Sequence, residues 1–489
     1  MTINVRMKRE KPLNLKPESK YFVTGMLLIS LNYWRKMKIW IHKKELVLHK
    51  FFSFSQDSLY MPLPNRLKKK YNNSLFFILE VTVKRMHMKQ VLGNFYHPIL
   101  HKMRQSPLLH RAAINKMIKK SIANETRKPR LYVDVTNVHY KDTGTGIARV
   151  TKEISTRIVN YNQKYDVLCV YNRDFDGYFD CKTDEIVTFS KGDIMFVLDN
   201  AIFYCNKYDK LYKRLMKIGI SVFFFFHDLI PIRYPETVEP KWTRRFEEFL
   251  MFLVNYTGII CNSRSTCDDL QNWILENSNV KRNQNLFIGY SLLGCDFSTC
   301  NRTVAKKIEK KEQLSFLMVA TVEPKKKYDQ AVKAFELLWK NEIDVKLTIV
   351  GRKGWKAEKI FNLIENSAEY GKRLFWYNTG ISDDELARLY EQNDAVIMAS
   401  ITEGFGLSVV EAARFGKPLI IRNISPFKEI AGENAFYFEG LEEKDLASAI
   451  KKWIELYKSG DAPDSAKINL RTWDDCTKDV YELLTGEQK

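Results

Sequence analysis

Two glutamates eight residues apart, with two glycines between them, are the strongest chemical signal in the sequence. The segment Ser400-Ile-Thr-Glu-Gly-Phe-Gly-Leu-Ser-Val-Val-Glu-Ala places Glu403 after an expected strand and Glu411 in the helix that follows. Gly404 and Gly406 let the backbone approach a ligand closely. The free N–H groups that open the helix can bind a diphosphate or sugar hydroxyls. The alternative is a glycine-rich turn with two unrelated glutamates.

Cations follow two strands of the same half of the chain. Glu323-Pro-Lys-Lys-Lys ends one expected strand, so Lys325 and Lys326 could neutralise a leaving diphosphate. Arg352 follows the next strand and is a weaker version of the same pattern. A basic surface turn is the alternative for each of them.

Histidine and glycine signals lie in the preceding part of the chain. His227 and Asp228 follow the apolar strand 222–226, where they could bind a sugar hydroxyl or stabilise transition-state charge. A structural, capping histidine is the alternative. Thr143-Gly-Thr-Gly-Ile-Ala-Arg opens a helix, and the spacing is not that of a dinucleotide site. It suits contact with an acceptor or a phosphate through Gly144, Gly146 and Arg149.

Alternating strands and helices must position these residues. Short β-branched runs predict two successive series of strands, and helical periodicity lies between them. This alternation predicts two parallel sheets covered on both faces, with ligands bound beyond the carboxyl ends of the strands. The expected strands are 131–135, 165–171, 193–198, 222–226 and 257–262, then 314–320, 345–351, 395–399 and 418–421; the expected helices include 148–160, 210–218 and 328–340.

The first 129 residues differ in texture from the rest. Residues 1–130 hold 28 Lys and Arg against 6 Asp and Glu, and the remainder holds 50 against 52. The basic charge therefore belongs to an N-terminal extension, the rest of the chain is nearly neutral, and no nucleic-acid partner is expected. Helices are expected at about 22–52 and 108–122. The run Arg66–Lys70 could contact anionic lipid, and a solvated helical extension is the alternative.

Cysteine spacing, the length of apolar runs and the position of one Asp-x-Asp pair bear on the cellular compartment and on metal binding. The eight cysteines form no Cys-x-x-Cys pair and no zinc spacing, as expected of reduced thiols in a cytoplasmic protein. The apolar stretch Tyr21–Leu31 is too short to span a bilayer and lacks a cleavage pattern. Asp174-Phe-Asp176 lies away from the other signals, so no metal and no other cofactor is expected. We expect a cytoplasmic protein, with contact to the inner face of the membrane through residues 1–129 as a further option.

Several segments in order resemble one enzyme family. The Glu403–Glu411 segment is similar to the E-x7-E signature of family 4 retaining glycosyltransferases, the glycosyl transferases group 1. The resemblance covers about 131–485, and matching segments lie at 134–150, 226–233, 292–296, 323–326 and 347–355.

The resemblance implies a GT-B fold, α/β, with two Rossmann-like doubly wound domains facing a cleft. Residues 130–305 would form the acceptor domain and 306–465 the nucleotide-sugar donor domain. Residues 466–489, with Trp473, would form a helix that crosses back to the first domain. Residues 1–129 would be a basic, mostly helical extension.

Residue roles are implied in the same way. Glu411 would bind the donor ribose, and Glu403 would contact hydroxyls of the transferred sugar. Lys326 matches the diphosphate-binding lysine, whereas Lys325 stands where the subgroup usually has arginine. His227 would lie near the donor sugar. The remaining donor contacts would come from Gly404, Phe405, Gly406, Leu407, Gly380, Ile381 and Arg352.

The expected activity is retaining, metal-independent sugar transfer. The leaving phosphate would accept the acceptor's proton. Subgroup resemblance favours GDP-mannose, with UDP- and dTDP-sugars open, and a glycan or lipid-linked oligosaccharide of bacterial surface polysaccharide as acceptor. The alternatives are a GT-B-fold nucleotide-sugar epimerase or phosphorylase and a non-catalytic scaffold of a polysaccharide assembly complex.

Overall fold

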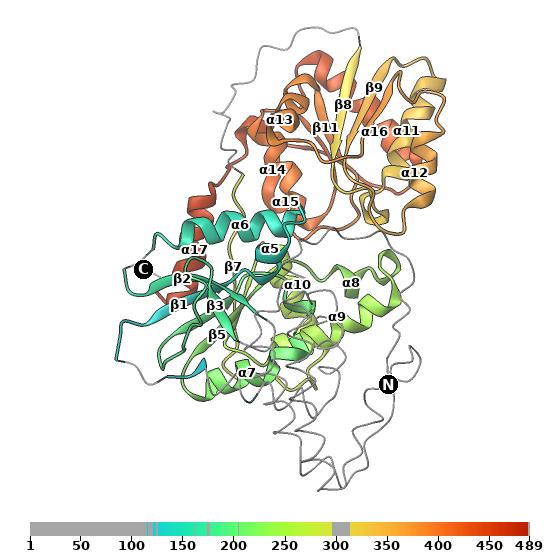
Figure 1. Cartoon of the computed structure of the whole chain (residues 1–489). Coiled ribbons are helices and arrows are strands. Elements are labelled where there is room, and N and C mark those ends of the chain that lie inside the picture. Colours follow the sequence, from blue (N-terminus) through green and yellow to red (C-terminus); the bar gives the residue numbers. More distant parts are fainter. Residues whose placement is uncertain are drawn as a thin grey trace, which may run out of the picture. The chain divides into compact units, whose positions relative to one another are not determined.

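The computed structural model describes residues 115, 121–123, 126–161, 163–173, 177–203, 205–295 and 313–487. The expected helix at 22–52, most of the one at 108–122, the run Arg66–Lys70, the Asp174–Asp176 pair and the boundary at 305/306 lie outside these residues. Two sheets with their helices make up the described part (Figure 1).

The first sheet has seven strands in the order β3-β2-β1-β4-β5-β6-β7. All neighbours pair in parallel except β2 and β3, which are antiparallel. The short connection between β2 and β3 permits only a hairpin, which the strand pattern did not reveal. The strands are β1 (Arg130–Asp134), β2 (Asp166–Asn172), β3 (Tyr178–Asp180), β4 (Ile194–Val197), β5 (Ser221–Phe226), β6 (Gly258–Cys261) and β7 (Phe287–Tyr290).

Side-chain caps fix where two helices of this domain begin. The Thr145 hydroxyl accepts a hydrogen bond from the Ala148 amide, and Ser263 accepts one from Thr266. The helices are α5 (Thr136–Tyr140), α6 (Gly146–Ile158), α7 (Cys205–Lys217), α8 (Ile230–Arg233), α9 (Pro240–Leu253) and α10 (Arg264–Glu276), with single turns at Ala201–Phe203 and Pro235–Thr237.

The second sheet has six parallel strands in the order β10-β9-β8-β11-β12-β13. These are β8 (Leu314–Val319), β9 (Val345–Val350), β10 (Leu374–Tyr377), β11 (Ala395–Met398), β12 (Leu419–Arg422) and β13 (Phe436–Phe438). Buried side chains of α11 (Tyr328–Lys340), α12 (Glu358–Glu365) and α16 (Glu443–Ser459) form one apolar cluster with the sheet. Those of α13 (Asp383–Gln392), α14 (Leu407–Arg414) and α15 (Ser425–Ala431) form another. Single turns lie at η4 (Pro324–Lys326) and Ser465–Lys467.

The last helix, α17 (Trp473–Thr485), belongs to the core of the first sheet. Trp473, Val480 and Tyr481 are buried in one cluster with Leu131 and Val133 of β1. A reciprocal capping box between Thr472 and Asp475 opens the helix. The chain therefore passes from the first sheet to the second and returns to the first.

The architecture confirms the expected pair of doubly wound sheets. Each strand expected from its apolar run lies where that run predicts it, and α11 matches the expected helix at 328–340. No helix among the described residues is long and apolar enough to cross a bilayer.

Gly294 allows the returning chain to dock. A Cβ on Gly294 would overlap the backbone nitrogen of Trp473. Gly294→Ala should therefore displace the start of α17 and lower the free energy of unfolding by about 2 kcal/mol or more. Chemical denaturation measures it. Gly146→Ala is the control, because its Cβ would lie at an ordinary 3.4 Å from Leu407. Equal stability of the Gly294→Ala variant and the wild type would contradict this docking.

Candidate active site

Glu403 and Lys326 form a partly buried ion pair at the carboxyl ends of the second sheet. Glu403 follows β11, Lys326 lies in the η4 turn after β8, and the Lys326 ammonium donates to the Glu403 carboxylate. Burial alone would raise the pKa of Glu403, but the charges of Lys326 and Lys325 outweigh burial and lower it. Glu403 is therefore ionised at neutral pH.

Lys325 supplies a second cation beside the first. Its ammonium lies 3.3 Å from the Glu323 carboxylate. Burial lowers the pKa of Lys325, but the carboxylates of Glu323, Asp228 and Glu403 more than offset it, so the pKa is raised. Two lysine side chains thus lie at this edge of the sheet, where they could bind a diphosphate.

Glu411 is buried between both domains. One carboxylate oxygen accepts from the Arg149 guanidinium of α6 at 2.6 Å, and the other accepts from the Tyr390 hydroxyl of α13 at 2.9 Å. Burial raises the pKa of Glu411, and Arg149 and Tyr390 offset part of that rise. Sequence reasoning missed Tyr390, because a tyrosine on the apolar face of an amphipathic helix looks like an ordinary core residue.

The Gly404 peptide contacts the first domain directly. Its carbonyl oxygen accepts from Ser263 Oγ at 2.6 Å and from Thr266 Oγ1 at 2.9 Å, in the first turn of α10. A Cβ on Gly404 would overlap the His227 carbonyl oxygen. Glycine is therefore required here by close backbone approach.

A carboxylate of the second domain caps the same helix. Glu429 of α15 accepts from the backbone amides of Arg264 at 2.7 Å and Ser265 at 2.8 Å, and from Ser265 Oγ at 2.6 Å. These amides have no partner inside their own helix. The sequence predicts a helix opening near Ser265 but carries no sign that Glu429, far along the chain, covers it.

His227 lies at the end of β5. Its Nε2 is buried without a hydrogen-bond partner among the described residues. Burial lowers the pKa of His227 to about 4, against the opposing charge of Asp199. The ring is therefore neutral at physiological pH and can exchange hydrogen bonds without adding charge. The neighbouring Asp228 accepts from the Ile230 amide at 3.0 Å.

Arg352 reaches from the second domain to the glycine turn of the first. Its guanidinium donates to the Thr143 carbonyl at 3.1 Å. Cβ atoms on Gly144 and Gly380 would lie 3.3 and 2.6 Å from the same guanidinium, so both glycines leave room for it. Arg352 thus joins the interdomain contact.

The remaining predicted residues lie around this contact. Gly406, with φ of 114°, caps the start of α14, and Leu407 faces Gly146. Phe405 is buried in the apolar cluster that also holds Trp473. Ile381 is partly buried and packs against the apolar cluster that α13, α14 and α15 form with the second sheet. No cluster of three or more His, Cys, Asp or Glu side chains suited to a metal ion occurs in the described ranges.

Residues 301–469 match the family model described as glycosyl transferases group 1. The match spans the second sheet and its helices, which carry Lys325, Lys326, Glu403 and Glu411.

Curated relatives extend the similarity over most of the chain. The serotype-specific mannosyltransferase WbdA of Escherichia coli is 34% identical over 375 residues, which is 72% of this chain and 46% of that protein. The O-antigen chain mannosyltransferase B of Escherichia coli is 26% identical over 180 residues, 34% of this chain and 45% of that protein. The chain thus spans less than half the length of these relatives.

Solved structures share the fold. Sucrose-phosphate synthase from Thermosynechococcus elongatus has a TM-score of 0.50 at 15% identity, over 74% of this chain and 96% of that one. The alpha,alpha-trehalose 6-phosphate synthase of Burkholderia multivorans has a TM-score of 0.51 at 9% identity, over 74% and 99%. The expected GT-B fold is confirmed.

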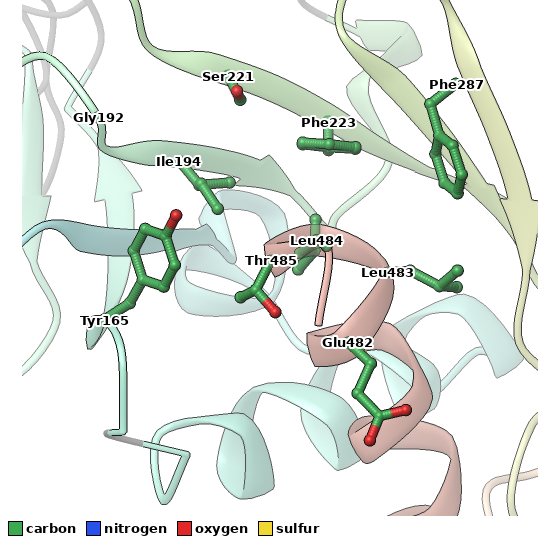
Figure 2. A pocket seen from close by; sticks show the side chains of 11 residues that line it. Tyr165, Gly192, Ile194, Ser221, Phe223, Phe287, Glu482, Leu483, Leu484 and Thr485 are labelled. Carbon is green, nitrogen blue, oxygen red and sulfur yellow. The ribbon is translucent and has the colours of Figure 1, made fainter. Parts of the chain in front are cut away.

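A cavity of about 410 Å³ lies at the opposite end of the first sheet (Figure 2). Ile194, Ser221 and Phe287, which begin β4, β5 and β7, line it together with Leu484 and Thr485 of α17. It is separate from the residues described above, which lie at carboxyl ends of strands.

Exchange of the α10 amides should report the interdomain contact. Glu429→Gln removes the charge that caps Arg264 and Ser265, so these two amides should lose hydrogen-exchange protection about tenfold or more. Glu433→Gln, at an exposed position nearby, is the control. Unchanged protection in Glu429→Gln would contradict the contact in solution.

Asp134, at the end of β1, should make stability depend on pH. It accepts from the Thr136 amide at 3.0 Å and the Tyr178 hydroxyl at 2.9 Å. Burial raises its pKa to about 7 from an ordinary 3.8, with Thr136 opposing. The folded state thus binds the Asp134 proton more tightly than the unfolded state does. This proton binding contributes to the free energy of unfolding fully below about pH 4, and the contribution is lost as pH rises through 7.

Asp134→Asn removes this titration and keeps the shape of the side chain. The free energy of unfolding of the wild type, measured by urea denaturation, should therefore fall relative to that of Asp134→Asn as the pH rises from 4 to 7. His227 acts in the opposite direction, because its lowered pKa costs stability as pH falls from 6.5 to 4. Both proteins carry His227, so its effect cancels in the difference. A difference that is flat with pH would show that Asp134 does not titrate in this range.

Proposed function

We propose that this chain is a retaining, metal-independent glycosyltransferase of family 4 that transfers mannose from GDP-mannose during assembly of a bacterial surface polysaccharide. The observation that supports this best is a contact across the two domains. The Gly404 peptide, next to the Glu403–Lys326 ion pair, lies against the His227 carbonyl, and the Lys325 ammonium is influenced by Asp228. The group 1 match and the mannosyltransferase relatives support the class of activity and the sugar.

The donor would exchange partners with the existing ion pairs. Its diphosphate would take Lys325 and Lys326, together with the N–H groups that open α14. This exchange would free Glu403 to accept hydrogen bonds from hydroxyls of the sugar. Glu411 would accept from the ribose, which requires the Arg149 guanidinium to move away or share the carboxylate. Arg149 would then be available to the phosphates.

The transfer would proceed on one face of the sugar. The bond between the anomeric carbon and the diphosphate oxygen breaks as the acceptor oxygen bonds to the same carbon. The acceptor's proton passes to the departing diphosphate, whose charge the two lysines stabilise. Glu403 would be engaged by hydroxyls of the sugar, and this transfer needs no covalent nucleophile, so the two-carboxylate glycosidase scheme is not needed. Neutral His227 would donate to or accept from a sugar hydroxyl.

The acceptor would bind the first domain. A glycan or lipid-linked oligosaccharide is the class that fits the relatives' named roles. Contact of residues 1–129 with anionic lipid would hold the enzyme near such an acceptor at the inner face of the membrane.

A nucleotide-sugar screen in EDTA tests the proposal. GDP-mannose should bind the full chain and be hydrolysed slowly, and should donate mannose to an added mannoside. Glu411→Ala should weaken binding about tenfold or more, because charge-assisted hydrogen bonds to the ribose are lost. Titration calorimetry measures the binding, and Glu433→Ala is the matched surface control.

Four outcomes would count against the proposal. Binding of no nucleotide sugar, or binding indifferent to Glu411, would favour a scaffold. Conversion of the donor sugar to its epimer without acceptor would favour an epimerase. Activity that requires Mn²⁺ would contradict metal independence.

A further inference from the structure

One ion pair between the domains occupies a carboxylate that the proposed function assigns to the donor. Arg149 of α6 donates to one oxygen of Glu411 at 2.6 Å, and the Tyr390 hydroxyl donates to the other at 2.9 Å. The side chain of Glu411 is 7% exposed and that of Arg149 is 22% exposed. Both carboxylate oxygens thus have a donor before any ribose hydroxyl arrives, and the stronger of the two donors is a cation.

A second carboxylate lies within reach of the same guanidinium. Glu153, one turn further along α6, lies 3.9 Å from Arg149 Nε. Glu153 also pairs with Arg157, whose Nε lies 3.4 Å from the Asp474 carboxylate at the start of α17. Opposite charges therefore alternate along α6 at the four-residue spacing that brings side chains together on a helix. Arg149 can leave Glu411 and still lie beside a carboxylate of its own helix.

The proposed diphosphate position lies close to the start of α6. A Cβ on Gly146, the first residue of α6, would lie 3.4 Å from the side chain of Leu407, the first residue of α14. The starts of the two helices are therefore adjacent, and each presents backbone N–H groups. Arg149 lies three residues after Gly146, which is about 4.5 Å along the helix axis. A diphosphate at the start of α14 is thus within the span of an extended arginine side chain.

The charges decide which ligands can take the place of Arg149. Ribose hydroxyls are neutral, so a nucleoside that displaced the guanidinium would leave the buried Glu411 carboxylate without its cation, which is costly. A diphosphate joined to the ribose offers the displaced guanidinium new anionic partners, which a planar guanidinium binds through paired hydrogen bonds. The exchange is therefore favourable only for a ligand that carries phosphate together with ribose.

We infer that Arg149 occupies the ribose position on Glu411 in the ligand-free chain and moves to the donor's diphosphate when the donor binds. The guanidinium then makes ribose binding conditional on phosphate, so the site selects nucleotides over nucleosides. The first domain contributes this selectivity, although the lysines that would bind the diphosphate belong to the second. This inference rests on the proposed function and identifies the residue that sets its phosphate requirement.

A nucleoside and a nucleotide with the same base distinguish this exchange from a structural ion pair. Titration calorimetry of the full chain compares guanosine with GDP. In Arg149→Met, guanosine should bind about fivefold more tightly than in the wild type, because its ribose no longer competes with a cation. GDP should bind about tenfold more weakly, because charge-assisted hydrogen bonds to its phosphates are lost. The preference for GDP over guanosine should thus fall about fiftyfold.

Two further variants control for the charge and for the substitution itself. Arg149→Lys keeps a cation without the planar fork and should retain part of the preference for GDP. Arg244→Met, at an arginine of α9 whose side chain is 85% exposed, should leave the preference unchanged. Uridine and UDP are titrated in parallel, so that the comparison also holds for a donor with a different base.

Affinities that do not change in opposite directions in Arg149→Met would overturn the exchange, and an equal loss for nucleoside and nucleotide would indicate a merely structural ion pair. A crystal structure of the wild type with the nucleoside diphosphate bound tests the exchange without any variant. Arg149 should bond to a phosphate oxygen while ribose hydroxyls donate to Glu411, and a guanidinium that stays on Glu411 overturns the inference. If the wild type binds neither GDP nor UDP, the proposed function itself is refuted.

Discussion

The rest of the candidate site depends on the close approach of the Gly404 backbone to the end of β5 and the start of α10. The absence of a side chain there allows the peptide to lie against the His227 carbonyl while Ser263 and Thr266 donate to it. Glu403 is the adjacent residue, and α14 begins three residues on. One backbone contact thus determines where an acidic side chain and a helix start lie relative to the histidine of the other domain.

Around this contact nearly every charge has a partner of opposite sign. Lys326 holds Glu403, Lys325 faces Glu323, and Arg149 holds Glu411. Burying any one of these charges alone would be expensive. A ligand that brings its own anion and hydroxyls can replace these partners one for one, so a phosphate and a polyhydroxylated ring match the site better than a neutral apolar molecule does.

Local patterns in the sequence sufficed for the central strands of both sheets and for the second-domain residues. Short apolar runs identify β1, β5 and β8, and glycines at strand ends identify Gly404 and Gly406, because these features are set within a few residues. The partners of those residues are set across hundreds of positions. Nothing near Glu411 indicates Tyr390, and nothing near Ser265 indicates Glu429. The sequence also did not reveal the edge strands of the two sheets, β3, β7, β10 and β13, because these strands have only three or four residues and none is buried along its whole length.

The chain leaves the first domain beside the residues at which it returns to that domain. Gly294 is packed against the Trp473 backbone, and the Cys295 amide donates to the Arg471 carbonyl at 3.2 Å. The end of the first domain and the start of α17 are therefore joined to one another. The contacts of Gly404 and Glu429 with the start of α10 then fix how the second sheet meets the first. Much of the entropic cost of aligning two reactants would already have been met when the chain folded.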